Sequence, residues 1–219
     1  MRILAITTIT TIATLVTVAV PASPVAAQDI TTEFRGFRIE GNVGGDRFQS
    51  LGEHNTKLGY GATAGFDGVI AGKIVVGPEA TYWRANNWSE NCGSGVNGGS
   101  VCSKSFQEYG AAVRVGYLIT PNLLVFGKGG YVNNEQRKRF DATSNLFYVN
   151  GQIVGPEKSY YNHGRTDGYQ VGGGVEYTLG DHMSGPLSGL YVSAQYVFSD
   201  YYDHTSRQRA MGGVGIRFK

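Results

Sequence analysis

One stretch of this chain places residues of a hydrolytic type side by side: Asp203-His204-Thr205-Ser206. A nucleophilic serine needs a base within hydrogen-bonding reach and a further group that orients that base. Asp203 is adjacent to His204 in sequence, and no other carboxylate residue follows it. We therefore interpret the segment as a polar loop tip and expect no enzymatic activity. The other histidines, His54, His163 and His182, stand alone, so we expect no metal site and no cofactor.

The two cysteines, Cys92 and Cys102, flank a polar stretch rich in glycine and serine that can bend back on itself. Two thiols at this spacing, with no histidine nearby, match no zinc-binding pattern. A chain that is exported meets an oxidising compartment, where disulfides persist. We predict a Cys92–Cys102 disulfide, which would stabilise the short loop by roughly 2–3 kcal/mol.

Charged residues recur at every second position of segments that are otherwise apolar or small. Side chains alternate between the two faces of a strand, so these charges share one face. The set is Arg38, Glu40, Asp46, Lys57, Glu79, Glu108, Arg114, Lys128, Glu176, Arg209 and Arg217. If this face is enclosed, its charges must pair, because an isolated buried ion costs several kcal/mol. We predict a charge-paired, largely closed lumen; a narrow channel that opens when pairs exchange partners is the alternative.

The segments that carry these charges read as strands, and the last one shows the pattern most clearly. Ala210, Val214, Ile216 and Phe218 fall on one face, and Arg209 and Arg217 fall on the other. Eight such segments occur, each close to the roughly 9–11 residues that cross a bilayer obliquely. An apolar outer face with a charged inner face reverses the pattern of a soluble barrel. The segments are 37–46, 57–66, 75–82, 108–117, 125–131, 169–177, 190–198 and 209–218.

The sequence thus predicts an all-β fold, an eight-stranded antiparallel transmembrane β-barrel with short periplasmic turns and long external loops. Asp67-Gly68 and Thr120-Pro121-Asn122 supply the short turns, and the connections after strands one, three, five and seven are longer or more polar. The largest is 134–165, which begins with the basic run 136–139. That run faces either lipopolysaccharide phosphates or solvent. Tyrosines near the strand ends predict two aromatic girdles: Tyr60, Tyr82, Tyr109, Tyr117, Tyr131, Tyr169, Tyr177 and Tyr196.

Residues 1–27 have the features of a cleaved signal peptide. Arg2 forms a short basic start, an uncharged apolar run follows, and Val25-Ala26-Ala27 is a small-residue cleavage site. A retained membrane helix is the alternative, disfavoured by Pro21 and Pro24. The mature domain is then 28–219, exported through the periplasm to the outer membrane of a Gram-negative cell. We expect outer-membrane lipid and lipopolysaccharide as partners, and a net charge of only +2 argues against nucleic acid.

Three segments carry a resemblance to a known family: 122–131, 168–177 and the closing 215–218. They resemble the Gram-negative outer-membrane β-barrel domain family, which includes the small outer-membrane immunogenic and porin-family proteins and is related to the OmpA transmembrane domain. The resemblance implies eight strands, insertion by the outer-membrane assembly machinery, and a terminal aromatic that belongs to the recognised assembly signal. Here that aromatic is Phe218, followed by Lys219.

These patterns predict a structural, surface-exposed and non-enzymatic outer-membrane protein. Two alternatives stay open. The barrel is a small porin that conducts ions or small solutes, or it is a surface adhesin or ligand receptor that acts through its external loops, 86–105 and 134–165. The sequence contains no motif that identifies an external ligand.

Overall fold

The computed structural model describes residues 32–85, 91–95, 99–142, 147–154, 158–179 and 188–218. The predicted signal peptide, His182 and Lys219 lie outside these residues. Among the described residues, no helix is long and apolar enough to cross a membrane.

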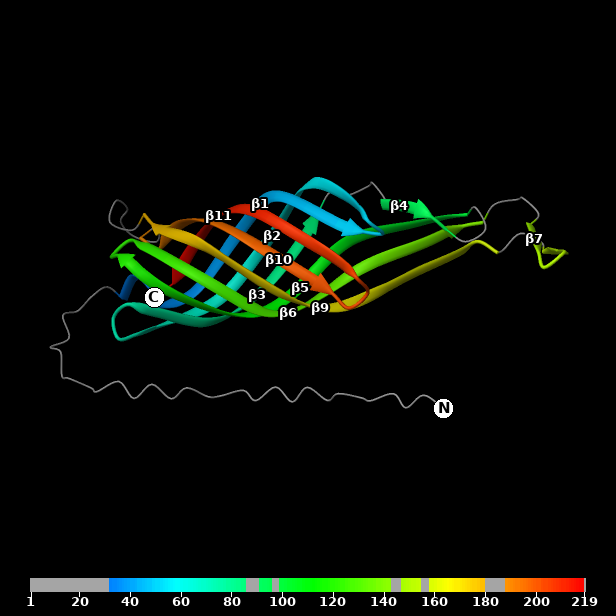
Figure 1. The fold of residues 1–219 in the computed structure, drawn as a ribbon. Coiled ribbons are helices and arrows are strands. Elements are labelled where there is room, and N and C mark those ends of the chain that lie inside the picture. Colours follow the sequence, from blue (N-terminus) through cyan, green and yellow to red (C-terminus); the bar gives the residue numbers. More distant parts are fainter. Residues whose placement is uncertain are drawn as a thin grey trace, which may run out of the picture.

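Eight long strands form a closed antiparallel ring (Figure 1). The ring closes because β1 pairs with β11 and β3 pairs with β5. This confirms the predicted all-β, eight-stranded barrel. The ring strands are β1 (Gly36–Ser50), β2 (Glu53–Ile70), β3 (Ile74–Ala85), β5 (Ser100–Thr120), β6 (Leu123–Asp141), β9 (Tyr160–Thr178), β10 (Leu190–Tyr201) and β11 (Thr205–Phe218).

Four short elements complete the described residues. The 3-10 turn η1 (Thr32–Phe34) precedes β1, and β4 (Asn91–Ser94) pairs with the outer part of β5. A separate two-stranded sheet contains β7 (Phe147–Val149) and β8 (Gln152–Val154).

Burial alternates along the barrel strands, as the pattern of apolar and charged residues predicts. On β1, Phe37, Ile39 and Val43 are exposed on the outside, whereas Arg38 and Glu40 are buried in the interior. A wall with this arrangement presents apolar side chains to lipid and encloses polar ones. The core of this molecule is therefore the interior of the ring.

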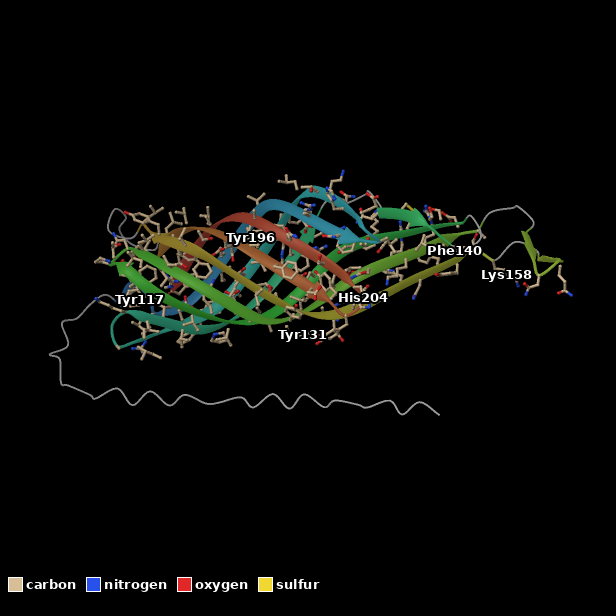
Figure 2. The ribbon with its side chains drawn as sticks, viewed as in Figure 1. Tyr117, Tyr131, Phe140, Lys158, Tyr196 and His204 are labelled. Atoms are coloured by element: carbon tan, nitrogen blue, oxygen red, sulfur yellow. A yellow bond between two sulfur atoms is a disulfide. The ribbon has the colours of Figure 1, made fainter. Side chains whose placement is uncertain are left out.

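Aromatic side chains mark the two borders of the apolar band. Phe37 and Phe218 stack with ring centroids 6.4 Å apart near the end where β1 begins and β11 ends, and Tyr117 lies at the same end (Figure 2). Tyr131 and Tyr196 lie midway along the molecule in that view. The borders are Tyr109 and Tyr117 on β5, and eight strand residues correspond to roughly 20 Å of height at a tilt near 40°. That height suits an outer membrane.

Several turns differ from the expected ones. Strand β2 continues to Ile70, so the predicted Asp67-Gly68 turn is wrong; the chain reverses at Ala71 and Gly72, which have φ values of 51° and 69°. Two consecutive positive φ values suit a tight hairpin whose twist matches its strands. Leu51 and Gly52 make a similar turn after β1, where the sequence suggested a longer connection.

The largest predicted loop, 134–165, contains long strand segments. Strand β6 continues to Asp141 and β9 begins at Tyr160, with pairing from Asn134↔Thr166 to Phe140↔Tyr160. Alternation could not reveal these segments because both of their faces are polar. Figure 1 shows β5, β6 and β9 extending well beyond the β10–β11 turn. We call residues 100–107 of β5, 133–141 of β6 and 160–167 of β9, with β4, the projecting sheet.

Candidate functional site: the barrel interior

The barrel interior contains buried side chains of both charges in equal number. Among the described residues of the barrel, six bases and six acids are less than 9% exposed; a seventh buried base, Lys104, lies on β5 in the projecting sheet. Their formal charges cancel, which is the condition for enclosing them at an acceptable cost. The bases are Arg38, Arg114, Lys128, Arg207, Arg209 and Arg217, and the acids are Glu40, Asp46, Asp67, Glu79, Glu108 and Glu176.

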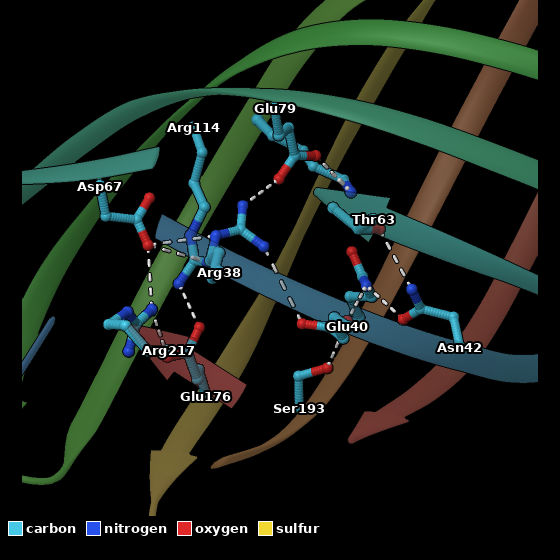
Figure 3. A network of polar contacts seen from close by, with 12 residues as sticks. Arg38, Glu40, Asn42, Thr63, Asp67, Glu79, Arg114, Glu176, Ser193 and Arg217 are labelled. Atoms are coloured by element: carbon cyan, nitrogen blue, oxygen red, sulfur yellow. Dashed lines mark hydrogen bonds and ion pairs between the residues drawn. The ribbon is translucent and has the colours of Figure 1, made fainter. Parts of the chain in front are cut away.

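Asp67 and Glu176 organise the cluster nearer the end where β1 begins and β11 ends (Figure 3). The Oδ2 atom of Asp67 lies 3.1 Å from Nε of Arg38 and 2.9 Å from Nη2 of Arg217. Glu176 lies 2.5 Å from Nη2 of Arg114 and 2.8 Å from Nη2 of Arg217. Arg217 therefore bridges two carboxylates that come from different strands, β2 and β9.

Glu79 and Glu40 extend this cluster along the interior. Glu79 lies 2.5 Å from Nη2 of Arg38 and 2.8 Å from Nζ of Lys128. Glu40 lies 3.9 Å from Nη1 of Arg38 and accepts hydrogen bonds from Ser193 at 2.9 Å and Gln195 at 3.1 Å. Neutral donors thus satisfy a carboxylate that is only weakly ion-paired.

A second cluster lies nearer the external mouth. Asp46 lies 3.2 Å from Nε of Arg207 and accepts a 2.5 Å hydrogen bond from the Trp83 indole. Glu108 lies 2.7 Å from Nη1 of Arg209 and 3.7 Å from Nη1 of Arg207. Glu108 also accepts a hydrogen bond from the Tyr201 hydroxyl.

Apolar side chains cap the first cluster, and others lie between the two clusters among polar ones. At the end where β1 begins and β11 ends, η1 inserts Phe34 into the barrel, where it packs with Val75, Leu118, Leu124 and Phe126. Trp83, Val197 and Met211 pack together at another level of the interior. A cavity of about 10 Å³ borders this second group, which is room for about one water molecule. The ion pairs therefore lie in a filled interior.

Ten of the eleven charged residues predicted to share the inner face lie buried in these clusters. Lys57 is the exception: it is half-buried and forms no ion pair with any described residue. Asp46, which stands opposite Lys57 in the β1–β2 register, pairs with Arg207 instead. The ten are Arg38, Glu40, Asp46, Glu79, Glu108, Arg114, Lys128, Glu176, Arg209 and Arg217.

Sequence reasoning missed Asp67 and Arg207, which are both central to the network. The predicted Asp67-Gly68 turn takes Asp67 out of its strand, and Arg207 precedes the last predicted strand, 209–218. The signal that identifies them is the alternation itself, continued beyond the assumed strand ends. Asp67 follows the outward-facing Phe66, and Arg207 lies two residues before the inward-facing Arg209.

The Asp203–Ser206 segment does not form a catalytic arrangement. Residues 202–204 form the β10–β11 turn, and Thr205 begins β11. Asp203 accepts a 2.7 Å hydrogen bond from the Thr205 hydroxyl, and its Oδ2 lies 3.2 Å from Nζ of Lys138. The carboxylate is thus held by groups other than His204, which fits the interpretation as a polar loop tip.

The disulfide and the basic run both lie in the projecting sheet. Cys92 and Cys102 are bonded with S–S 2.07 Å, which joins β4 to β5 and confirms the predicted pair. The basic run 136–139 is strand rather than loop, so that part of the prediction is wrong. Arg137 lies over the ring of Tyr161, with 5.4 Å to its centroid, and Arg139 pairs with Asp141 at 2.9 Å.

The architecture matches one known family along nearly the whole chain. The family model described as "Outer membrane protein beta-barrel domain" matches residues 12–218. The chain belongs to this family. Its place is the Gram-negative outer membrane, and the apolar band of this outer-membrane barrel is the surface that contacts lipid. No protein of curated function matches the sequence.

Solved outer-membrane barrels share the fold at low sequence identity. Ail of Yersinia pestis is 16% identical, with a TM-score of 0.50 over 84% of this chain and 99% of Ail. Ail has also been solved in complex with the heparin analogue sucrose octasulfate. Neisserial surface protein A is 13% identical, with a TM-score of 0.47 over 84% of this chain and 97% of that protein. At this identity the likeness to Ail establishes the fold alone.

Proposed function

We propose that this protein is a non-enzymatic outer-membrane barrel with a closed lumen, whose role is structural and carried on its external surface. The observation that supports the closed lumen most directly is the set of paired, buried charges inside the ring, with a cavity of only about 10 Å³ between the two clusters. The interior charges are matched six to six and are buried. A permeating ion would have to displace groups that already satisfy one another.

The energetics of the ion pairs favour a static plug over an exchanging one. Asp67 contacts both Arg38 and Arg217, so moving either arginine leaves a charged group without its partner in a buried site. Uncompensated buried charges cost several kcal/mol. Arg217 also lies over the rings of Phe34 and Tyr191, at 5.1 and 5.0 Å from their centroids. These contacts hold the guanidinium against displacement.

The external role is supported by the projecting sheet, which continues three barrel strands past the outer aromatic border. Surface segments held on a rigid scaffold are where recognition residues concentrate. Lipopolysaccharide is a proposed neighbour of this region, because Arg137 and Arg139 lie beyond Tyr131 on the same outward-facing side of β6. Phosphate groups suit arginine side chains in such a position.

Two features of export complete the proposal. Residues 1–27 are removed as a signal peptide, so the mature chain begins at Gln28. Phe218 belongs to the signal that the outer-membrane assembly machinery recognises. Its outward position on β11, 48% exposed and stacked on Phe37, supports such a role because the ring is accessible at the edge of the wall.

Single-channel recording separates the closed barrel from a porin. The refolded mature chain in a planar bilayer is expected to be silent. A variant with both Arg114→Ala and Glu176→Ala, which removes a buried pair, is expected to show flickering current. The matched control removes the Lys138–Asp203 pair at the external mouth (Lys138→Ala with Asp203→Ala) and is expected to stay silent. Steady openings in the wild type that change with the interior variant would make the protein a porin.

A further inference from the structure

We propose that the outer edge of β9, residues 160–166, together with the polar cleft beside it, binds an extended peptide segment of a partner protein by strand addition. The inference deepens the proposed surface role and rests on it. It names the part of the projecting sheet that makes the contact and the chemistry of what is bound.

The edge is free because β10 ends before β9 does. Pairing between β9 and β10 extends only from Gly168 to Thr178 on β9, and the chain then turns at residues 202–204. Pairing between β9 and β6 continues out to Tyr160. In residues 160–166, β9 therefore has β6 on one side and no described strand on the other. Figure 1 shows this part of β9 as the margin of the projecting sheet.

Two hydrogen bonds reveal which backbone groups point away from β6. The Asp167 carbonyl accepts from the amide of Tyr202, on the β10 side, at 3.0 Å. The Thr178 amide donates to the carbonyl of Asn122, on the β6 side, at 2.9 Å. Backbone groups in an antiparallel strand alternate between its two neighbours. The backbone N–H and C=O groups of odd-numbered residues therefore point to the unpaired side of β9. The outermost of these residues are Tyr161, His163 and Arg165.

This edge has few of the features that protect strand edges from pairing. Residues 160–165 are exposed, and the segment contains no proline. No register shift interrupts its pairing with β6, so it has no bulge that would twist it away. A straight edge with its N–H and C=O groups directed at solvent is a template for another strand. Arg165 is its only Lys or Arg residue, and Nε2 of His163 lies 2.7 Å from Oε1 of Glu135.

A polar cleft of about 140 Å³ accompanies the edge on its inner face. Residues from β6, β9 and the β10–β11 turn line it, among them Gln136, Lys138, Asn162, Gly164, Thr166 and Asp203. A Cβ atom at Gly164 would meet nothing within 4 Å, so the space beside this residue is open. A side chain from a strand added next to Gly164 would project into this cleft.

The cleft contains a buried hydrogen-bonding atom without a partner. Gln136 is 4% exposed, and its Nε2 donates to the Thr205 hydroxyl at 2.8 Å. Its Oε1 atom has no hydrogen-bond partner among the described residues. An incoming hydroxyl or amide donor would satisfy this acceptor. The partner segment is therefore an extended peptide with a Ser, Thr, Asn or Gln side chain at the position opposite Gly164.

Hydrogen exchange of the folded chain in nanodiscs tests the edge before any ligand is added. The amides of Tyr161, His163 and Arg165 are expected to exchange rapidly, and those of Asn162 and Gly164 more slowly. Equal protection of both sets would show that the edge is already covered and would overturn the proposal.

Peptide selection then tests binding. A phage-displayed library of random heptapeptides is selected on the refolded mature chain in nanodiscs, with empty nanodiscs subtracted. Peptides with Ser, Thr, Asn or Gln flanked by extended, β-branched residues are expected to be enriched. The decisive variant is His163→Pro, which removes an outward amide without taking a donor from the β6 ladder. The control is His163→Ala, which removes the same side chain and keeps the amide.

A synthetic copy of the selected peptide is expected to lose at least tenfold in affinity with His163→Pro and to bind the His163→Ala variant within about twofold of wild type. Unchanged far-ultraviolet circular dichroism and heat-modifiable migration show that both variants fold. Failure to enrich any peptide, or equal binding by the proline variant, overturns the proposal. Binding of a soluble oligosaccharide that is unaffected by His163→Pro, with no selected peptide, would assign the cleft to carbohydrate instead.

The outcome is independent of the conductance test. A conducting barrel that still binds peptide at β9 would overturn the closed lumen and leave the edge proposal intact. A silent barrel that binds no peptide would support the closed lumen and overturn the edge proposal.

Discussion

The strands β5, β6 and β9 pass through two regions, the barrel and the projecting sheet, in which ion pairs are buried to different extents. Inside the barrel each strand has two neighbours, and ion pairs such as Arg217–Asp67 are almost fully buried. In the projecting sheet β9 has one described neighbour, and the Arg139–Asp141 pair is 40% and 50% exposed. Buried pairs leave an uncompensated charge when one member is removed, whereas exposed pairs are screened by water. The stability of the barrel therefore depends on its charged residues, whereas the stability of the projecting sheet depends little on its exposed ion pairs.

The largest expected effect comes from breaking a buried carboxylate. Asp67→Ala leaves Arg38 and Arg217 without a shared partner in the interior and should destabilise the barrel by about 3–5 kcal/mol. Urea unfolding in lipid bilayers measures it. The matched control, Asp141→Ala in the projecting sheet, removes an exposed pair and should cost no more than about 1 kcal/mol. Equal costs for the two variants would mean that the interior is wet and the distinction between the regions is wrong.

The second-largest loss of stability is expected from a charge placed on the outer face. Val113 is 57% exposed and lies between Tyr109 and Tyr117 on β5, within the apolar band. Val113→Arg should cost roughly 2–4 kcal/mol if it lies near the bilayer midplane. Tyr161→Arg, on the outward face of the projecting sheet, loses the contact with Arg137 and should cost no more than about 1 kcal/mol. Unfolding in vesicles compares them, and a harmless Val113→Arg would show that the membrane border has been drawn at the wrong height.

The smallest effect on the barrel is expected from the disulfide. Replacing Cys92 and Cys102 by serine removes a constraint worth roughly 2–3 kcal/mol to its loop. The bond joins β4 to β5 within the projecting sheet, so the loss should remain local. Hydrogen exchange should show faster opening of β4 and the start of β5, with an unchanged urea midpoint for the barrel. A shifted midpoint would mean that the two regions unfold together.

The barrel strands were readable from sequence because the bilayer imposes a strict pattern on them. Lipid outside and enclosed charges inside force alternation, and the alternation of Arg209 to Phe218 reports β11 directly. Asp67 was not predicted to face the interior because an Asp-Gly pair resembles a turn, although the chain reverses four residues later. Arg207 was not predicted to face the interior because the last strand was predicted to begin at residue 209, whereas β11 begins at Thr205. In both cases a local signal was given more weight than the continuing alternation.

The projecting sheet could not be predicted in the same way. Both faces of β6 beyond Val132 carry polar residues, including the buried Asn134 and Gln136, so the alternation of apolar and polar residues disappears. The basic run 136–139 therefore looked like the beginning of a loop. Pairing with β9 is a long-range property, and no local feature of either segment reports it.

The sequence by itself determined the membrane-spanning ring, its facing, its disulfide and most of the charges it encloses, because burial in lipid leaves alternation as the only workable pattern. Tertiary structure alone decided which charges pair and that Lys57 forms no ion pair with the described residues. It also decided that β9 extends beyond the end of β10. The physical reason is that these outcomes depend on register and on strand length across the ring. Two residues that lie more than a hundred positions apart, such as Asp67 and Arg217, meet only once the ring has closed.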